Sequence, residues 1–190
     1  MFHQSLTRSR NTAYLCAAAT LPGMTADTPR DVINAICAGI RTDSVIYWFN
    51  FLEVSLGSEA FHKLFEICLT DNGSEFKRVN ELELSPDNTI RTSVYYCDPM
   101  QSGQKGRLEK NHEYIRYVIP KGTSLSSYTQ EDMTVLMNHI NSTKRPGLNN
   151  RSPYELIADD DKNMHLLMKV LGLKMIPADE VNLTRSLLGK

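Results

Sequence analysis

Two acidic residues, Asp71 and Glu109, have the side chains and the neighbours for chemistry on a phosphate ester. Carboxylate oxygens suit hard divalent cations such as Mg²⁺ or Mn²⁺. Two such ions held about 4 Å apart can activate an attacking hydroxyl and stabilise the leaving oxygen in an in-line displacement at phosphorus. Nearby lysines and arginines would hold a phosphate backbone without reading its sequence. The residue types indicate metal-assisted phosphoryl transfer on a polyanion.

A functional role for Asp71 requires an element that positions its carboxylate, and a strand that ends immediately before it would do so. Residues 65–70 alternate apolar and polar side chains, a pattern that predicts a short strand, and Asn72-Gly73 favours a sharp turn after it. Open α/β sheets place their sites at the carboxyl ends of their strands, so this position suits a functional carboxylate. On its own, Asp71-Asn72-Gly73 is most often a simple hairpin turn.

Glu109 belongs to a charged segment, residues 104–116, that we predict to be helical. Glu113 lies one turn further on and shares a face with Glu109. The adjoining face would pack on the sheet through Leu108, His112 and Ile115. On spacing alone, an ordinary solvated face is the stronger interpretation of the two acids.

The rest of the chain predicts a mixed α/β protein. Residues 42–56 carry apolar side chains at helical spacing and stop at Gly57, with Trp48 in a structural role, and residues 58–64 continue as helix. Residues 92–97 favour a second strand, whereas residues 77–90 suggest a surface loop. Residues 32–40 fit a helix or a buried strand equally well.

Further helices are expected in the carboxyl-terminal half. Thr129 followed by Asp132 predicts a capped helix to about residue 140, and Ser152-Pro153 predicts another helix start. Residues 164–173 suggest a short apolar helix, and the tail after Pro177 is expected to be extended.

Charge is balanced over the whole chain but not locally. The 190 residues carry 22 acidic and 21 basic side chains, so no overall field points to a nucleic-acid partner. Residues 104–121 hold five bases against two acids, and Lys144, Arg145 and Arg151 form a second basic cluster, which is usually solvated surface.

Cysteine spacing and hydropathy favour a reducing, cytoplasmic setting. Cys16, Cys37, Cys68 and Cys97 are far apart and lack the spacing of a zinc site, and Cys68 reads as a buried free thiol. Residues 13–21 faintly resemble a signal peptide but are too short to span a bilayer, so we expect no membrane association.

Several short motifs occur in a specific order from residue 69 onward. They are Leu69-Thr70-Asp71-Asn72-Gly73-Ser74-Glu75-Phe76, Tyr96-Cys97-Asp98-Pro99, Gln104-Lys105-Gly106, Glu109, Asn111-His112-Glu113, Ile115-Arg116, Pro120-Lys121-Gly122-Thr123-Ser124, Asn138-His139-Ile140-Asn141-Ser142 and Ser152-Pro153-Tyr154-Glu155. Together they resemble the catalytic core of bacterial insertion-sequence transposases of the insertion-sequence thirty family. The resemblance covers residues from about 42 to the carboxyl terminus and implies the ribonuclease H-like fold of retroviral integrases.

The resemblance also implies a site. In that family three carboxylates bind two Mg²⁺ ions (or Mn²⁺), and the second and third match Asp71 and Glu109, with Glu113 only a neighbour. No residue is identifiable as the first aspartate; Asp27, Asp31 and Asp43 are the acids to examine. Contact with DNA, both element ends and target, is expected from the side chains of Asn72, Lys105, Arg107, Lys110, Arg116 and Lys121.

We interpret the chain as a divergent segment (1–41), a partial integrase-like core (42–160) and a helical tail (161–190). The usual leading strands and the helix-turn-helix of the family are not recognisable, so we expect weak or no strand transfer from the chain alone. Residues 102–103 and 107–108 also depart from the family's pattern. The principal hypothesis is transposition by DNA cleavage and joining, with a homo-oligomer or intact transposase as partner. The alternatives are a non-catalytic DNA-binding or interaction remnant and a metal-dependent nuclease.

Overall fold

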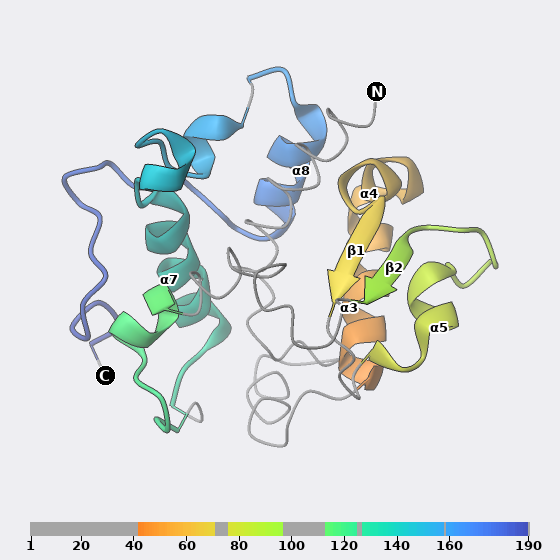
Figure 1. Ribbon diagram of the computed structural model, residues 1–190, viewed down its shortest axis with the longest axis horizontal. Helices are drawn as coiled ribbons and strands as arrows, with labels where there is room; N and C mark the ends of the chain where they lie inside the picture. Colours follow the sequence, from red (N-terminus) through yellow and green to blue (C-terminus); the bar gives the residue numbers. More distant parts are fainter. Residues whose placement is uncertain (1–41, 71–75, 97–112, 125–126, 158, 190) are drawn as a thin grey trace. The chain divides into compact units, whose positions relative to one another are not determined.

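The computed structural model describes residues 42–70, 76–96, 113–124, 127–157 and 159–189 (Figure 1). A division between Lys105 and Gly106 separates these residues into two compact units. The first contains helices α3, α4 and α5 and strands β1 and β2, and the second contains helices α7 and α8. Each unit is described by itself.

Helices α3 (Thr42–Leu56) and α4 (Ser58–Leu64) confirm the helical pattern of this region. Phe49, Leu52 and Phe61 are buried where the two helices pack, and the rings of Phe49 and Phe61 meet edge to face. Gly57 separates the helices with a φ of 81°, a conformation that side-chain-bearing residues rarely adopt. Trp48 is buried and stacks on Phe51, as its predicted structural role requires.

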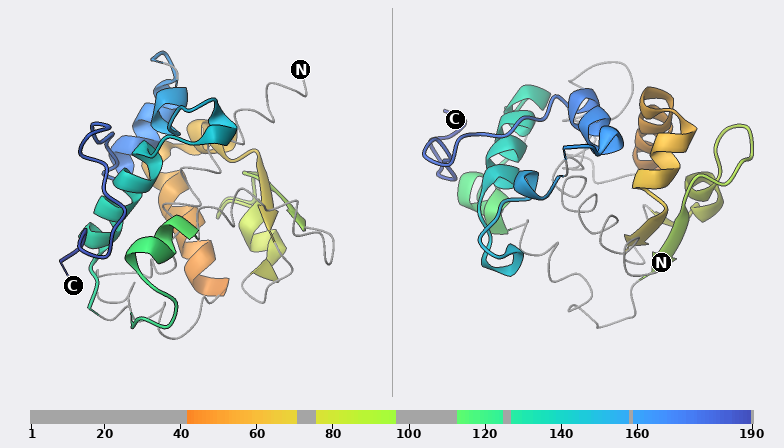
Figure 2. Two further views of the ribbon diagram at one scale, coloured as in Figure 1. Left: turned by 60° about the vertical axis from the view of Figure 1, so that its left-hand side comes forward. Right: turned by 90° about the horizontal axis from the view of Figure 1, so that it is seen from above.

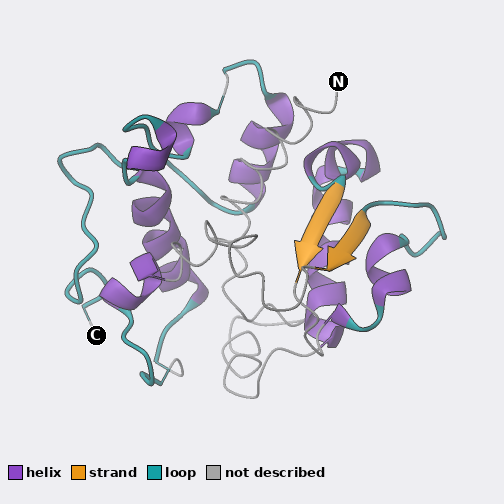
Figure 3. Ribbon diagram, viewed as in Figure 1, coloured by secondary structure: helices purple, strands orange, loops and turns teal. Residues whose placement is uncertain are grey.

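Strands β1 (Ile67–Thr70) and β2 (Ser93–Tyr96) pair in parallel and confirm both strand predictions (Figure 3). The register sets Ile67 opposite Ser93 and Thr70 opposite Tyr96. Because the strands are parallel and in step, their carboxyl ends lie at the same edge. Cys68 of β1 is a free thiol, as predicted, and burial raises its pKa to about 11, so it stays protonated at neutral pH.

The predicted surface loop over residues 77–90 is wrong for part of its length, because helix α5 (Val79–Glu83) lies within it. This helix buries one apolar side chain, Leu82, among polar ones, so no apolar periodicity marked it. The residues after α5 do form a turn, in agreement with the predicted loop. Asn88 takes a φ of 64°, and Ser85 donates and accepts backbone hydrogen bonds across the turn.

The second unit is built on α7 (Gln130–Ser142), whose start confirms the capping box predicted at Thr129. Leu136, Met137 and Ile140 are buried along it. Residues 113–118 are also helical, and the chain leaves this helix through the buried pair Val118 and Ile119.

Three shorter elements follow α7. They are the 3-10 turns η3 (Pro146–Leu148) and η4 (Tyr154–Leu156) and helix α8 (Lys162–Val170). The helix predicted to start at Ser152 is thus a single turn, although Ser152 and Glu155 do form reciprocal cap hydrogen bonds. The tail after Pro177 contains turns at residues 178–180 and 185–188, so the prediction of an extended tail is wrong.

Leu173 to Asn182 lie along α7 and are held by its side chains (Figure 2). The backbone N–H groups of Lys174, Ile176 and Asn182 donate to Asn138, Ser142 and His139, respectively. In the part of the chain that the structure describes, no helix is long and apolar enough to cross a membrane.

Candidate metal and nucleic-acid site

The edge at which β1 and β2 both end is the structural feature nearest to the predicted site. β1 ends at Thr70, the residue before Asp71 in the sequence, and β2 ends at Tyr96. Asp71, Asn72 and Glu109 lie outside the described residues, so the convergence of the two carboxylates stays a prediction. Within the described ranges, no three His, Cys, Asp or Glu side chains group as metal ligands.

Three aspartates were considered as the remaining metal ligand, and the structure describes one of them. Asp27 and Asp31 lie outside the described residues. Asp43 is exposed at the start of α3 and forms an ion pair with Arg78, which also pairs with Glu81. An aspartate paired in this way on a helix is a poor match for the first aspartate, which the resemblance places within a strand.

Of the predicted nucleic-acid contacts, Arg116 and Lys121 are described and both are exposed. Arg116 belongs to the helix of residues 113–118, and Lys121 follows the Pro120 that ends this segment. Lys105, Arg107 and Lys110 lie outside the described residues. The structure therefore places two of the predicted cations at the surface of the second unit.

A buried arginine, Arg91, holds the elements around the β1–β2 pair. It is 2% exposed and donates to the carbonyls of Glu81 and Leu82 at 2.6 and 2.8 Å, which caps the last turn of α5. It also donates to Asn50 at 2.6 Å and to Glu53 at 3.1 Å, both on α3. One side chain thereby ties α3 and α5 to the start of β2.

The partner carboxylate, Glu53, is buried as well and accepts a second hydrogen bond from the Ser85 hydroxyl. Arg91 further lies over the rings of Phe49 and Phe61, at 5.5 and 5.9 Å from their centroids. Burying a charge requires this degree of pairing, because an unpaired buried charge is costly.

The sequence analysis predicted no role for Arg91 or Glu53. A signal for Glu53 existed, because it falls beside Leu52 on the packing face of α3, where a charge is out of place.

The outer edge of β2 is closed by α5. The N–H of Ser93 donates to Glu66 next to β1, so the alternate residue Val94 turns its N–H away from β1. That N–H donates to the carboxylate of Glu83 at 2.9 Å. The Glu83 side chain thus occupies a backbone donor on the outer edge of β2, and protection of this kind disfavours pairing with a further strand on that side.

In the second unit, Arg145 fixes the helix of residues 113–118. Its guanidinium lies 5.2 Å from the ring centroid of Tyr114 and donates to the carbonyl of Ile140 at 3.3 Å. Arg145 is only 6% exposed, so its assignment to a solvated basic cluster is wrong. Lys144 and Arg151, the other members of that cluster, are exposed as expected.

Known proteins related to this chain were found by sequence. A transposase for insertion sequence element IS1086 of Cupriavidus metallidurans is 38% identical over 88 residues. The transposase InsI for insertion sequence element IS30A of Escherichia coli is 33% identical over 87 residues, and the transposase for insertion sequence element IS4351 of Bacteroides fragilis is 29% identical over 92 residues. About half of this chain is related to insertion-sequence transposases.

The resemblance to insertion-sequence transposases that the motifs predicted is thereby confirmed over about half of the chain. The matches cover 46 to 48% of this chain and 22 to 27% of the transposases, so the chain spans about a quarter of these relatives. No family model and no solved structure matches the chain. The ribonuclease H-like fold accordingly stays a prediction.

Proposed function

We propose that this chain carries part of a transposase-type catalytic core that cleaves DNA and joins its ends by two-metal phosphoryl transfer. The observation that carries the proposal is its relationship, over about half its length, to insertion-sequence transposases. The parallel pair β1–β2 supports it, because both strands end at one edge and β1 ends at the residue before Asp71. A ribonuclease H-like sheet that grows on the β1 side fits the closed outer edge of β2.

Asp71 and Glu109 are the residues that would hold Mg²⁺ or Mn²⁺. Two carboxylates suit hard cations, and the carboxyl end of a parallel strand pair is a suitable place for one of them. The bound ions would activate the attacking hydroxyl and stabilise the leaving oxygen. The chain itself must bring the two acids together and hold the DNA backbone beside them, the latter through exposed cations such as Arg116 and Lys121.

The first prediction tests the metal site by thermal unfolding of the full chain in Mn²⁺. A ligand that binds only the folded state raises the unfolding temperature with concentration. We expect this rise in the natural chain and its loss in Asp71→Asn and in Glu109→Gln. Glu113→Gln is the matched control and should retain the rise, because Glu113 is the neighbour of the site.

Four outcomes are informative. Equal loss in all three variants would mean a diffuse acidic surface in place of a site. Joining of DNA with metal present, abolished in Asp71→Asn, would establish transposase chemistry, whereas cleavage without joining would favour a nuclease. DNA binding that metal does not affect, with no rise in the unfolding temperature, would favour the non-catalytic alternative.

A further inference from the structure

The segment from Lys144 to Arg151, the basic loop, is closed on itself. The backbone N–H of Arg145 donates to the carbonyl of Arg151 at 3.1 Å, and the two residues form an isolated antiparallel bridge. Between them the chain makes the turn η3 and then two left-handed residues, Asn149 and Asn150, with φ of 54° and 58°. The basic loop therefore has a defined shape before any partner binds.

The base of the loop is anchored in the second unit. Arg145 is buried, stacks on Tyr114 and donates to Ile140 at the end of α7. Just beyond the loop, Ser152 donates its backbone N–H to Glu155 at 2.6 Å, and Tyr154 donates its hydroxyl to the buried Asn138 at 3.1 Å. Both ends of the loop are thus tied to packed residues.

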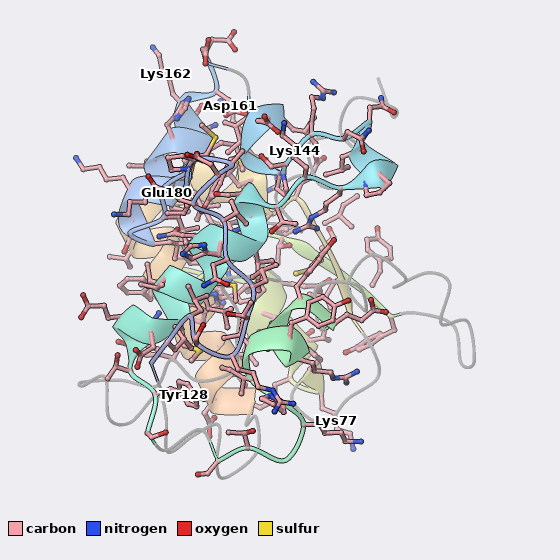
Figure 4. All side chains as sticks on the ribbon, turned by 90° about the vertical axis from the view of Figure 1, so that its left-hand side faces the viewer. Lys77, Tyr128, Lys144, Asp161, Lys162 and Glu180 are labelled. Atoms are coloured by element: carbon pink, nitrogen blue, oxygen red, sulfur yellow. The ribbon has the colours of Figure 1, made fainter. Side chains whose placement is uncertain are left out.

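The side chains that leave the loop are cationic or amide-bearing. Lys144, Asn149, Asn150 and Arg151 are all exposed. Among the described residues, neither Lys144 nor Arg151 forms an ion pair. The nearby Glu155 is already bound to Ser152; that hydrogen bond lowers the pKa of Glu155, and the charges of Lys144 and Arg151 act in the same direction. Both cations therefore lie near one carboxylate and outnumber it (Figure 4 labels Lys144).

Most backbone N–H groups of the loop are already used. The N–H groups of Leu148, Asn149, Asn150 and Arg151 donate to carbonyls within the loop. An anion at this surface would therefore be bound mainly by side chains, through the ammonium, the guanidinium and the two amides. Such contacts suit the repeated phosphates of a nucleic-acid backbone and carry no sequence information.

We propose that the basic loop is a phosphate-backbone contact for DNA, formed by Lys144 and Arg151 with Asn149 and Asn150. It is separate from the DNA-contact residues expected around Glu109, and the inference rests on the proposed function, since DNA is the substrate there. Rigidity of the loop favours binding, because the side chains extend from a backbone that is ordered before contact.

The test is the salt dependence of binding between the full chain and a fluorescent 30-base-pair DNA duplex, measured by anisotropy. Each phosphate contact contributes about 0.9 to the slope of log affinity against log salt, so Lys144→Ala/Arg151→Ala should lower the slope by about 1.8. Lys162→Ala/Lys169→Ala is the matched control. It removes the same charge from exposed positions of α8 in the same unit and should leave the slope unchanged.

The outcomes separate this inference from the proposed function. If the natural chain binds DNA and both double variants keep its slope, the basic loop does not contact the DNA backbone. The proposed function is unaffected by that result. No DNA binding by the natural chain would overturn both. Equal binding of poly-glutamate, lost in the loop variant, would reassign the loop to an acidic protein partner. The reversed pair Lys144→Arg/Arg151→Lys keeps the charge and should retain the slope.

Discussion

The imidazole of His139 holds the tail of the chain against α7. Its Nδ1 accepts the backbone N–H of Asn182 at 3.0 Å, so this nitrogen carries no proton in the folded state. Burial lowers the pKa of His139, and the carboxylate of Glu180 on the tail partly offsets the effect (Figure 4). The neutral form is the one that makes the contact.

The second prediction is therefore a loss of the tail contact in acid. Because the folded pKa is below the ordinary value of about 6.5, the folded state resists protonation. The contact is complete above that value and weakens as the pH falls through it toward the lowered pKa. Amide hydrogen exchange of residues 174–183, corrected for intrinsic rates, should rise over this range and not in α7.

Two variants serve this measurement. His139→Gln should remove the pH transition in the tail, whereas His165→Gln, an exposed histidine of α8, should leave it unchanged. A transition that persists in His139→Gln would show that another group holds the tail.

The two buried arginines show that the residue type at one position does not predict its burial. Arg145 stands in a basic run and Arg91 in a polar one, yet both are buried. The sequence shows charge but not the carbonyls that accept from it, and those come from α5 and from the end of α7. Asp71 and Glu109 were predicted as site residues because a motif, not an isolated charge, marked them.

At the scale of elements, local signals predicted what depends on local interactions. The stop at Gly57, the strands β1 and β2 and the start of α7 each follow from a turn residue, a β-rich run or a cap. Helix α5 was missed because five residues with one buried side chain leave no period to detect. The parallel pairing depends on contacts between distant segments, so neither strand's own residues predict it.

The third prediction concerns the cap of α7. Thr129 accepts from the backbone N–H of Asp132 at 3.2 Å, and the Asp132 carboxylate accepts from the backbone N–H of Thr129 at 2.6 Å. Loss of the first contact in Thr129→Ala should destabilise the second unit by about 1 kcal/mol. Thr129→Ser keeps the hydroxyl and is the control. Urea unfolding followed by circular dichroism gives both values, and an equal loss in the two variants would show that the methyl group matters instead.

At the scale of the whole molecule, the described residues contain two sets of buried side chains. Phe61, Leu52 and Leu82 fill the first unit, and Leu136, Ile140 and Leu167 fill the second. The buried polar networks divide in the same way: Arg91 and Glu53 serve one unit, and Asn138 and Tyr154 serve the other. The named buried contacts thus lie within one unit or the other.

The last prediction follows from this division. Arg91→Ala leaves Glu53 buried without its charge partner, a change that typically costs about 3 to 5 kcal/mol. Because the partners of Arg91 all lie in the first unit, hydrogen exchange should rise in α3, α4, α5, β1 and β2 and stay constant in α7 and α8.

Arg78→Ala is the control for this variant, since its ion pairs with Asp43 and Glu81 are exposed and such pairs contribute little to stability. It removes an arginine from the same unit and should change exchange little. A comparable rise in α7 and α8 on replacing Arg91 would mean that the two units unfold as one, and the stability of the basic loop would then depend on the unit that contains β1 and β2.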